Sequence, residues 1–79
     1  MKFIETKING AYIVETTPIV DDRGSFVNSW NKNEFCEHNL DVNLTECNIA
    51  LNLKKGTVRG FHYQSHPYEG AKLVRCIKG

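Results

Sequence analysis

The sequence of 79 residues has no long apolar run and almost no excess of charge. No stretch approaches the ~20 consecutive apolar residues that a membrane-spanning helix needs. The first ten residues are interrupted by Glu5 and Lys7, so they lack the apolar core of a signal peptide. Lysine and arginine number 10 against 9 aspartates and glutamates, which gives a formal net charge of +1. The sequence therefore gives no reason to expect nucleic acid or a membrane as a partner.

Cysteine is scarce and unpatterned. Cys36, Cys47 and Cys76 form neither a CxxC pair nor the even number that a disulfide framework requires. We expect three reduced thiols in a cytoplasmic protein, because disulfides persist mainly in oxidising compartments. Internal repeats, low-complexity segments and Pro/Gly/Ser-rich linkers are also missing, so residues 1–79 are predicted to have no internal domain boundary.

What the sequence does contain is a series of short β-forming runs. Residues 2–7 and 11–16 are predicted strands on either side of the turn signal Asn9-Gly10, and Pro18 ends the second strand. The segment "DDRG", residues 21–24, is predicted to form a turn.

The next segments predict a strand and then a helix. Residues 25–30 are a predicted strand that follows the turn, where Gly24 can take a positive φ. Asn31 is a candidate N-cap of a short helix over residues 31–39, with Glu34 placed three residues later as in a weak capping box.

The second half contains the clearest strand pattern. In "LTECNIALNL", residues 44–53, apolar side chains alternate with polar ones, as expected for a strand with two different faces. Residues 57–64 and 71–79 are further predicted strands, separated by a loop at 65–70. About six strands and one short helix predict a mainly β fold, an antiparallel jelly roll of the cupin type. Because such a fold usually has about eight strands, we expect this chain to be the N-terminal portion of a larger domain.

The strand "TVRGFHYQ", residues 57–64, contains the most unusual set of side chains. His62 is a candidate general base, since histidine titrates near neutral pH. Arg59 offers a planar fork for phosphate or carboxylate, and Lys72 on the next predicted strand adds a point charge. Strict alternation places Arg59 and His62 on opposite faces, so we predict a β-bulge at Gly60 that brings both into one pocket.

Each of these residues also has a simpler structural interpretation. A single strand histidine is more often a satisfied core or surface residue, and exposed cations usually form weak ion pairs or point into solvent; this applies to His62, Arg59 and Lys72. Arg23 is most simply a turn residue that pairs with Asp21 or Asp22.

A metal site is a competing interpretation of the same region. The sequence resembles a motif of metal-binding cupins, in which Gly is followed after five residues by His, after one more residue by a second His, and after three or four more by Glu. Gly56, His62 and Glu69 follow this spacing, but Gln64 stands in place of the second histidine. First-row metals prefer imidazole to an amide oxygen, and His66 is displaced by two residues. We therefore expect no metal and no cofactor.

Three motifs together resemble a known family. "DDRGSF", "VRGFHYQ" and "GAKLVRCIKG" are similar, in order and spacing, to motifs of the dTDP-4-dehydrorhamnose 3,5-epimerases of rhamnose biosynthesis. The resemblance covers the whole chain and roughly the first half of a family member. It implies a cytoplasmic, homodimeric cupin-type epimerase that acts without metal on a dTDP-linked 4-keto sugar.

The resemblance also implies roles for individual residues. His62 would remove the proton beside the C4 ketone, Lys72 would stabilise the resulting oxyanion, and Arg59 would hold the diphosphate or neighbouring sugar oxygens. The remaining substrate contacts would come from Arg23 at the nucleotide or phosphate, Phe26 against the base, Asn48 at the thymine or sugar, and Glu46 and Asn28. The last two depart from the family pattern, which has glutamine and glutamate there, and Cys47 replaces an aspartate.

The family's proton-donating tyrosine and the carboxylate that orients the histidine are both expected beyond residue 79, so the chain alone is expected to be inactive. Four alternatives remain open at this point. They are a 3-epimerase, a sugar 3,4-ketoisomerase, a metal-dependent cupin, and a non-catalytic remnant that binds nucleotide or only dimerises. Gln64 argues against the ketoisomerases, which tend to have "RGxHAH" in place of "RGFHYQ".

Overall fold

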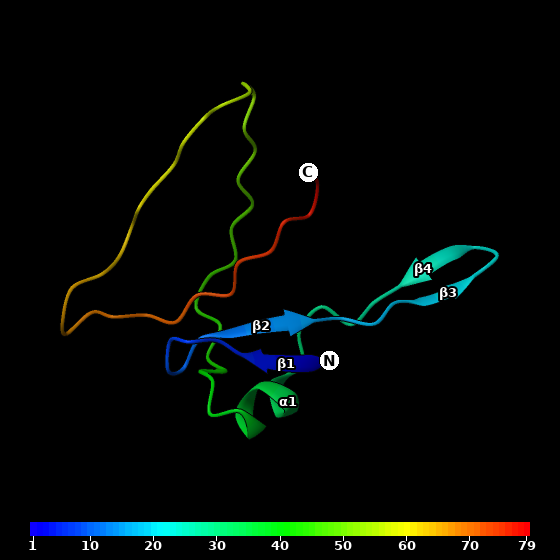
Figure 1. Ribbon diagram of the computed structural model, residues 1–79, viewed down its shortest axis with the longest axis horizontal. Coiled ribbons are helices and arrows are strands. Elements are labelled where there is room, and N and C mark those ends of the chain that lie inside the picture. The colour runs from blue at the N-terminus through cyan, green and yellow to red at the C-terminus, as the bar shows by residue number, and fades with distance from the viewer. The chain divides into compact units, whose positions relative to one another are not determined.

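The computed structural model describes every residue from Met1 to Gly79. The chain divides into two units, residues 1–43 and residues 44–79. All assigned helices and strands lie in the first unit, in the order β1, β2, β3, β4, α1 (Figure 1). The six-residue α1 is far too short to cross a bilayer, and the structure has no other helix. That residues 1–79 belong to one domain without an internal boundary stays a prediction.

The first two strands form an antiparallel hairpin. β1 (Lys2–Glu5) pairs with β2 (Tyr12–Glu15) over their whole length. The connection contains the predicted Asn9-Gly10 turn, where Gly10 has φ 79° and the N–H of Ala11 donates to the carbonyl of Ile8 at 3.0 Å. Both predicted strands are therefore confirmed, each shorter than the sequence pattern indicated.

A second, smaller hairpin follows. β3 (Ile19–Asp21) and β4 (Gly24–Phe26) pair antiparallel around the predicted turn, and Gly24 has the expected positive φ, 125°. β3 was not predicted, because Pro18 was interpreted only as the end of the preceding strand. Proline is also compatible with the residue just before a strand, since it need not donate to the ladder there.

The predicted strand over residues 25–30 is shorter in the structure. β4 ends at Phe26, and beyond it the side chain of Asn28 accepts a hydrogen bond from the backbone N–H of Trp30 at 3.3 Å. Such a local side-chain bond offers the backbone an alternative to the ladder.

The predicted helix is confirmed as α1 (Lys32–Glu37). The side chain of Asn31 accepts from the backbone N–H groups of Asn33 and Glu34 at 3.0 and 3.1 Å, which satisfies two N–H groups that have no partner within the helix. The carboxylate of Glu34 binds the amino group of Met1 at 2.7 Å and so ties α1 to the start of β1.

The helix ends in a Schellman motif, which was not predicted from the sequence. Asn39 takes φ 55°, its N–H donates to the carbonyl of Cys36 at 3.0 Å, and the N–H of Leu40 donates to the carbonyl of Phe35 at 3.1 Å. These bonds satisfy carbonyl groups that the last helical turn leaves unpaired.

A small aromatic cluster holds the first unit together. Phe35 of α1 is the buried hydrophobic residue of the structure, 5% exposed. Its ring meets Phe3 of β1 edge-on at a centroid distance of 5.2 Å and lies 6.0 Å from Trp30. Phe3 also stacks on His38 at 3.9 Å and meets Tyr12 edge-on at 6.2 Å. The cluster thus packs α1 against the β1–β2 hairpin.

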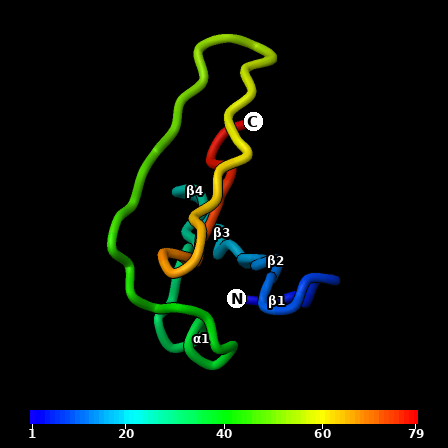
Figure 2. Tube along the Cα trace, turned by 90° about the vertical axis from the view of Figure 1, so that its left-hand side faces the viewer, coloured from blue at the N-terminus to red at the C-terminus, as the bar shows by residue number.

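The second unit contains the predicted turns without paired strands. The N–H of Thr57 donates to Lys54 across the turn at 54–57, and the N–H of Tyr68 donates to Ser65 within the predicted loop. From the first of these turns the chain runs away in two diverging arms, which Figures 1 and 2 show from two directions (green to yellow, then yellow to orange).

The predicted strands 44–53, 57–64 and 71–79 are consequently not strands in this structure. A β-strand is defined by backbone hydrogen bonds to a neighbouring strand, and the only bonds between backbone groups of residues 44–79 are the two turn bonds. The fold class is nevertheless confirmed: small antiparallel strands and one short helix make a mainly β arrangement, consistent with an incomplete jelly roll.

Candidate functional site

Arg23 is the candidate side chain with the most defined geometry. It follows β3 in the two-residue turn to β4, and its guanidinium contacts the carboxylate of Asp21. Nη2 donates to Oδ2 at 2.6 Å, while Nε lies 3.1 Å from Oδ2 and 3.3 Å from Oδ1. The backbone N–H of Arg23 also donates to Oδ1 at 2.9 Å. The structure thus selects Asp21 rather than Asp22 as the partner of Arg23.

These bonds change the electrostatics of both groups. The side-chain bonds from Arg23, and then its backbone N–H, hold the pKa of the Asp21 carboxyl below its usual value. The same contact raises the pKa of the Arg23 guanidinium above its usual value. Both groups are therefore charged at neutral pH, and the 87% exposure of the Arg23 side chain to water also favours its charged form.

The other two candidates of the first unit lie close to this turn in sequence. Phe26 ends β4 and is 72% exposed, so its ring is accessible for stacking. The side-chain oxygen of Asn28 is engaged by the backbone of Trp30, as described above.

In the second unit, Arg59 is the candidate with a defined contact. Its Nη2 donates to the backbone carbonyl of Leu51 at 3.0 Å, across the turn at 54–57. Gly60, which follows Arg59, has a φ of 115°, a conformation that favours glycine. The predicted bulge requires such a residue at this position. The bulge itself stays a prediction, because residues 57–64 have no partner strand.

The remaining candidates are exposed and make no hydrogen bond with one another. This holds for His62, Lys72, Glu46 and Asn48. The structure therefore does not bring His62, Arg59 and Lys72 together into a hydrogen-bonded cluster, and their shared pocket stays a prediction.

Two residues of the competing metal pattern do meet. Nδ1 of His66 lies 3.0 Å from Oε1 of Glu69, three residues later. The side chain of Gln64 lies close to Gly70, where an added Cβ would come within 3.1 Å of its Oε1. No group of three or more histidine, cysteine, aspartate or glutamate side chains comes together in the structure.

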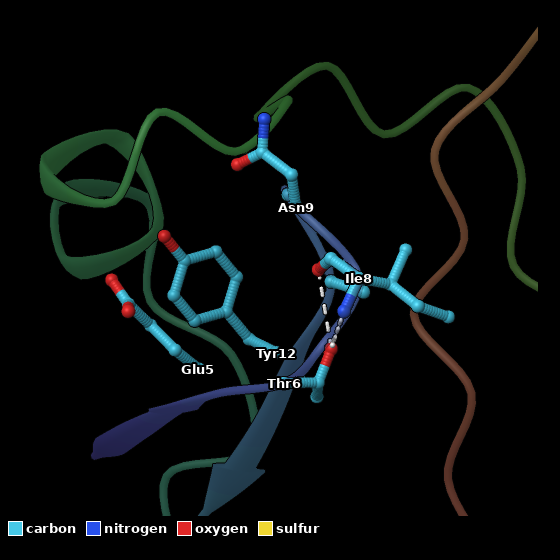
Figure 3. A pocket seen from close by; sticks show the side chains of 7 residues that line it. Glu5, Thr6, Ile8, Asn9 and Tyr12 are labelled. Carbon is cyan, nitrogen blue, oxygen red and sulfur yellow. Dashed lines mark hydrogen bonds between the residues drawn. The ribbon is translucent and has the colours of Figure 1, made fainter.

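A small hollow lies elsewhere, at the β1–β2 connection (Figure 3). The hydroxyl of Thr6 accepts a hydrogen bond from the backbone N–H of Ile8 at 3.1 Å and donates one to the carbonyl of Ile8 at 3.2 Å. Glu5, Asn9 and Tyr12 complete its wall in Figure 3, and none of the predicted site residues lies there. The hollow is a feature of the turn.

Sequence reasoning recognised Asp21 only as one of two possible partners of Arg23. The signal that identifies it is the spacing: an aspartate two residues before another residue can accept that residue's backbone N–H in an Asx-turn. Asp22, adjacent to Arg23, cannot make that turn. The same spacing brings the carboxylate to the guanidinium.

The Asp21–Arg23 turn, His62, Arg59 and Lys72 all lie within the three motifs that resemble those of an epimerase family. A family model described as dTDP-4-dehydrorhamnose 3,5-epimerase matches residues 5–79. The chain belongs to this family.

Curated relatives carry the same name. A dTDP-4-dehydrorhamnose 3,5-epimerase of Methanothermobacter thermautotrophicus is 37% identical over 99% of this chain and 41% of its own length. Those of Shigella flexneri and Escherichia coli are 39% and 38% identical over the whole chain and 44% and 43% of their own lengths. The chain thus spans about two fifths of these relatives. No solved structure gives a significant match.

Proposed function

We propose that the complete protein is an epimerase of a dTDP-linked 4-keto-6-deoxy sugar in deoxysugar biosynthesis. The observation that carries this proposal is the family match over residues 5–79, which includes all three motifs of the sequence analysis. Because the chain spans about two fifths of its relatives, the activity is proposed for the whole protein.

The proposed chemistry begins with His62. Its neutral imidazole takes the proton from a carbon next to the C4 ketone, and the electron pair of the broken C–H bond moves into an enolate. Lys72 places an ammonium where negative charge develops on the ketone oxygen, which lowers the barrier to proton removal. A donor on the opposite face of the sugar then returns a proton to the same carbon, and we assign that role to a tyrosine outside residues 1–79.

Substrate binding is proposed to rest on two guanidinium groups and an aromatic ring. Arg59 and Arg23 bind the diphosphate or neighbouring sugar oxygens, since guanidinium matches phosphate with paired N–H donors. Phe26 stacks on the base, supported by its exposure. The finer nucleotide contacts fall to Asn48, Glu46 and Asn28.

The proposed setting is a cytoplasmic homodimer that acts without metal or cofactor and binds neither nucleic acid nor membrane. The three exposed cysteines are free, which suits a reducing compartment. The near-zero net charge of the chain gives no electrostatic attraction to nucleic acid.

The test is proton exchange in the full-length protein. In heavy water, the wild-type protein is expected to wash deuterium into a dTDP-4-keto-6-deoxy sugar at C3 and C5, as NMR or mass spectrometry would record. His62→Asn should slow the exchange by about 10²-fold or more, the usual contribution of a positioned base. The matched control is His66→Asn, which removes another exposed imidazole of the same unit and should leave the rate unchanged.

Each alternative function gives a different result. Exchange at C3 alone would indicate a 3-epimerase, and migration of the keto group would indicate a ketoisomerase. Loss of activity with a chelator, together with bound metal by elemental analysis, would indicate a metal-dependent cupin. Binding of dTDP without any exchange would indicate a non-catalytic protein. Undiminished exchange in His62→Asn would show that another group is the base.

A further inference from the structure

The contact between Asp21 and Arg23 uses only part of the guanidinium. A guanidinium carries five N–H donors, and the carboxylate engages Nε and one hydrogen of Nη2. Both hydrogens of Nη1 and the second hydrogen of Nη2 make no hydrogen bond with the protein. These remaining donors lie along the outer edge of the fork, where two parallel N–H groups match two phosphate oxygens.

The carboxylate is itself held in place by the backbone. Its Oδ1 accepts the N–H of Arg23 at 2.9 Å within the turn between β3 and β4. The backbone bond restrains rotation of the carboxylate, and the bonds from Nε and Nη2 to the carboxylate restrain the orientation of the guanidinium relative to the hairpin. An unclamped arginine on such an exposed turn would sample many rotamers and would lose that freedom on binding a ligand.

We infer that Asp21 is a positioning residue that presents the outer Nη1/Nη2 edge of Arg23 to the diphosphate of a nucleotide ligand. Asp21 touches no ligand in this arrangement and acts only through Arg23. The inference deepens the proposed function and rests on it, because it assigns an anionic ligand to the turn.

A competing effect has the opposite sign. The carboxylate reduces the positive charge that an anion meets, so its removal could strengthen binding. Both side chains face solvent, with exposed fractions of 87% for Arg23 and 42% for Asp21, where charge interactions are weakened by water and salt. An anion at the outer edge of the fork would lie farther from Asp21 than the guanidinium does, so salt weakens its repulsion by the carboxylate more than it weakens the direct contact of 2.6 Å. We therefore expect the loss of orientation to dominate at physiological ionic strength.

The experiment compares Asp21→Asn with Asp22→Asn in the full-length protein. Both substitutions remove one negative charge from the same turn, but only the first loses the ionic contact with Arg23. Asp21→Asn keeps an oxygen that can accept the backbone N–H of Arg23, so the turn is retained. Binding of dTDP is measured by calorimetry, and KM and kcat with the keto sugar are measured alongside.

We expect Asp21→Asn to raise the Kd for dTDP and the KM about three- to fivefold with kcat unchanged, the range of an exposed ion pair. Asp22→Asn should change both by less than about twofold. In an Arg23→Ala background, Asp21→Asn should have no further effect, because residues that act through one another are not additive. A purely structural role for Asp21 would persist in that background.

Three results would overturn the inference: equal behaviour of the two Asn variants, tighter dTDP binding by Asp21→Asn, or a full effect of Asp21→Asn without Arg23. A wild-type protein that binds dTDP but exchanges no sugar proton would refute the epimerase proposal and leave the role of Asp21 intact. A wild-type protein that does not bind dTDP would refute both.

Discussion

Residues 1–43 and residues 44–79 differ in where their backbone hydrogen bonds go. The first region places them in two hairpins and a helix capped at both ends. The second region has two turn bonds, one at Thr57 and one at Tyr68. Yet the second region carries the clearest strand pattern and the proposed base. Hairpins and caps form from contacts close in sequence, whereas long strands depend on neighbours that are distant in sequence.

The largest effect should come from the aromatic cluster, which only the first region has. Phe35→Ala removes a ring that is 5% exposed and is expected to cost about 3 kcal/mol. A unit of this size holds only a few kcal/mol of stability in total. Substitution should therefore unfold most of residues 1–43, which backbone amide exchange in β1 and β2 would detect.

Phe61→Ala is the matched control in the second region. The same ring is fully exposed there, so its removal should change the free energy of unfolding by less than about 0.5 kcal/mol. If Phe61→Ala proves as costly as Phe35→Ala, the second region has a core of its own and the contrast between the regions is wrong.

This contrast also explains how much of the fold was predictable. Three predicted features depend only on residues close in sequence, and all three are confirmed. They are the Asn9-Gly10 turn, the turn before Gly24 and the Asn31 cap. The sequence pattern of residues 44–53 predicts which side chains share a face of a strand. It contains no information on which segment supplies the hydrogen-bonding neighbour, so it could not determine whether a ladder forms.

The candidate site divides in the same way. The sequence predicted Asp21 or Asp22 as the partner of Arg23, because both lie within two residues of it. The shared pocket of Arg59 and His62 requires a bulge in a paired strand, and pairing is a long-range property. Its prediction therefore rests on the residue types and on the family, and stays a prediction.

Glycine substitutions should sharpen the comparison with a smaller effect. Gly24 and Gly60 have similar positive φ values, 125° and 115°, and an added Cβ would meet no close contact at either position. Gly24→Ala should cost about 2 kcal/mol, because the β3–β4 ladder holds its backbone in place. Gly60→Ala should cost less than about 0.5 kcal/mol in this chain, since unpaired backbone can relax to an ordinary φ.

The measurement for Gly24→Ala is again amide exchange, now of β3 and β4. For Gly60→Ala, whose neighbouring amides are mostly unbonded, it is the free energy of unfolding in denaturant. A cost for Gly60→Ala close to that of Gly24→Ala would mean that the backbone at Gly60 is held as firmly as in a hairpin. That result would favour an intact bulge in residues 57–64.

The smallest effect concerns pH and tests the one well-defined ionic contact of the candidate site. The pKa of Asp21 is lowered from its ordinary value of 3.8 in the folded hairpin, so the contact with Arg23 stabilises the folded state above that value. The stabilisation should be lost as the pH falls below 3.8 and through the lowered pKa. Because the pair is exposed, salt should weaken the effect further.

NMR titration of the Arg23 Nε–H signal would follow this contact directly, with Asp21→Asn as the control that has no carboxyl group to protonate. The signal of the wild-type protein should shift at a pH below 3.8, and that of Asp21→Asn should stay constant over the same range. A shift centred above 3.8 would mean that Arg23 does not stabilise the charged carboxylate. The turn would then lack the ionic contact between Asp21 and Arg23, which is the feature that distinguishes Arg23 from the candidate residues of the second region.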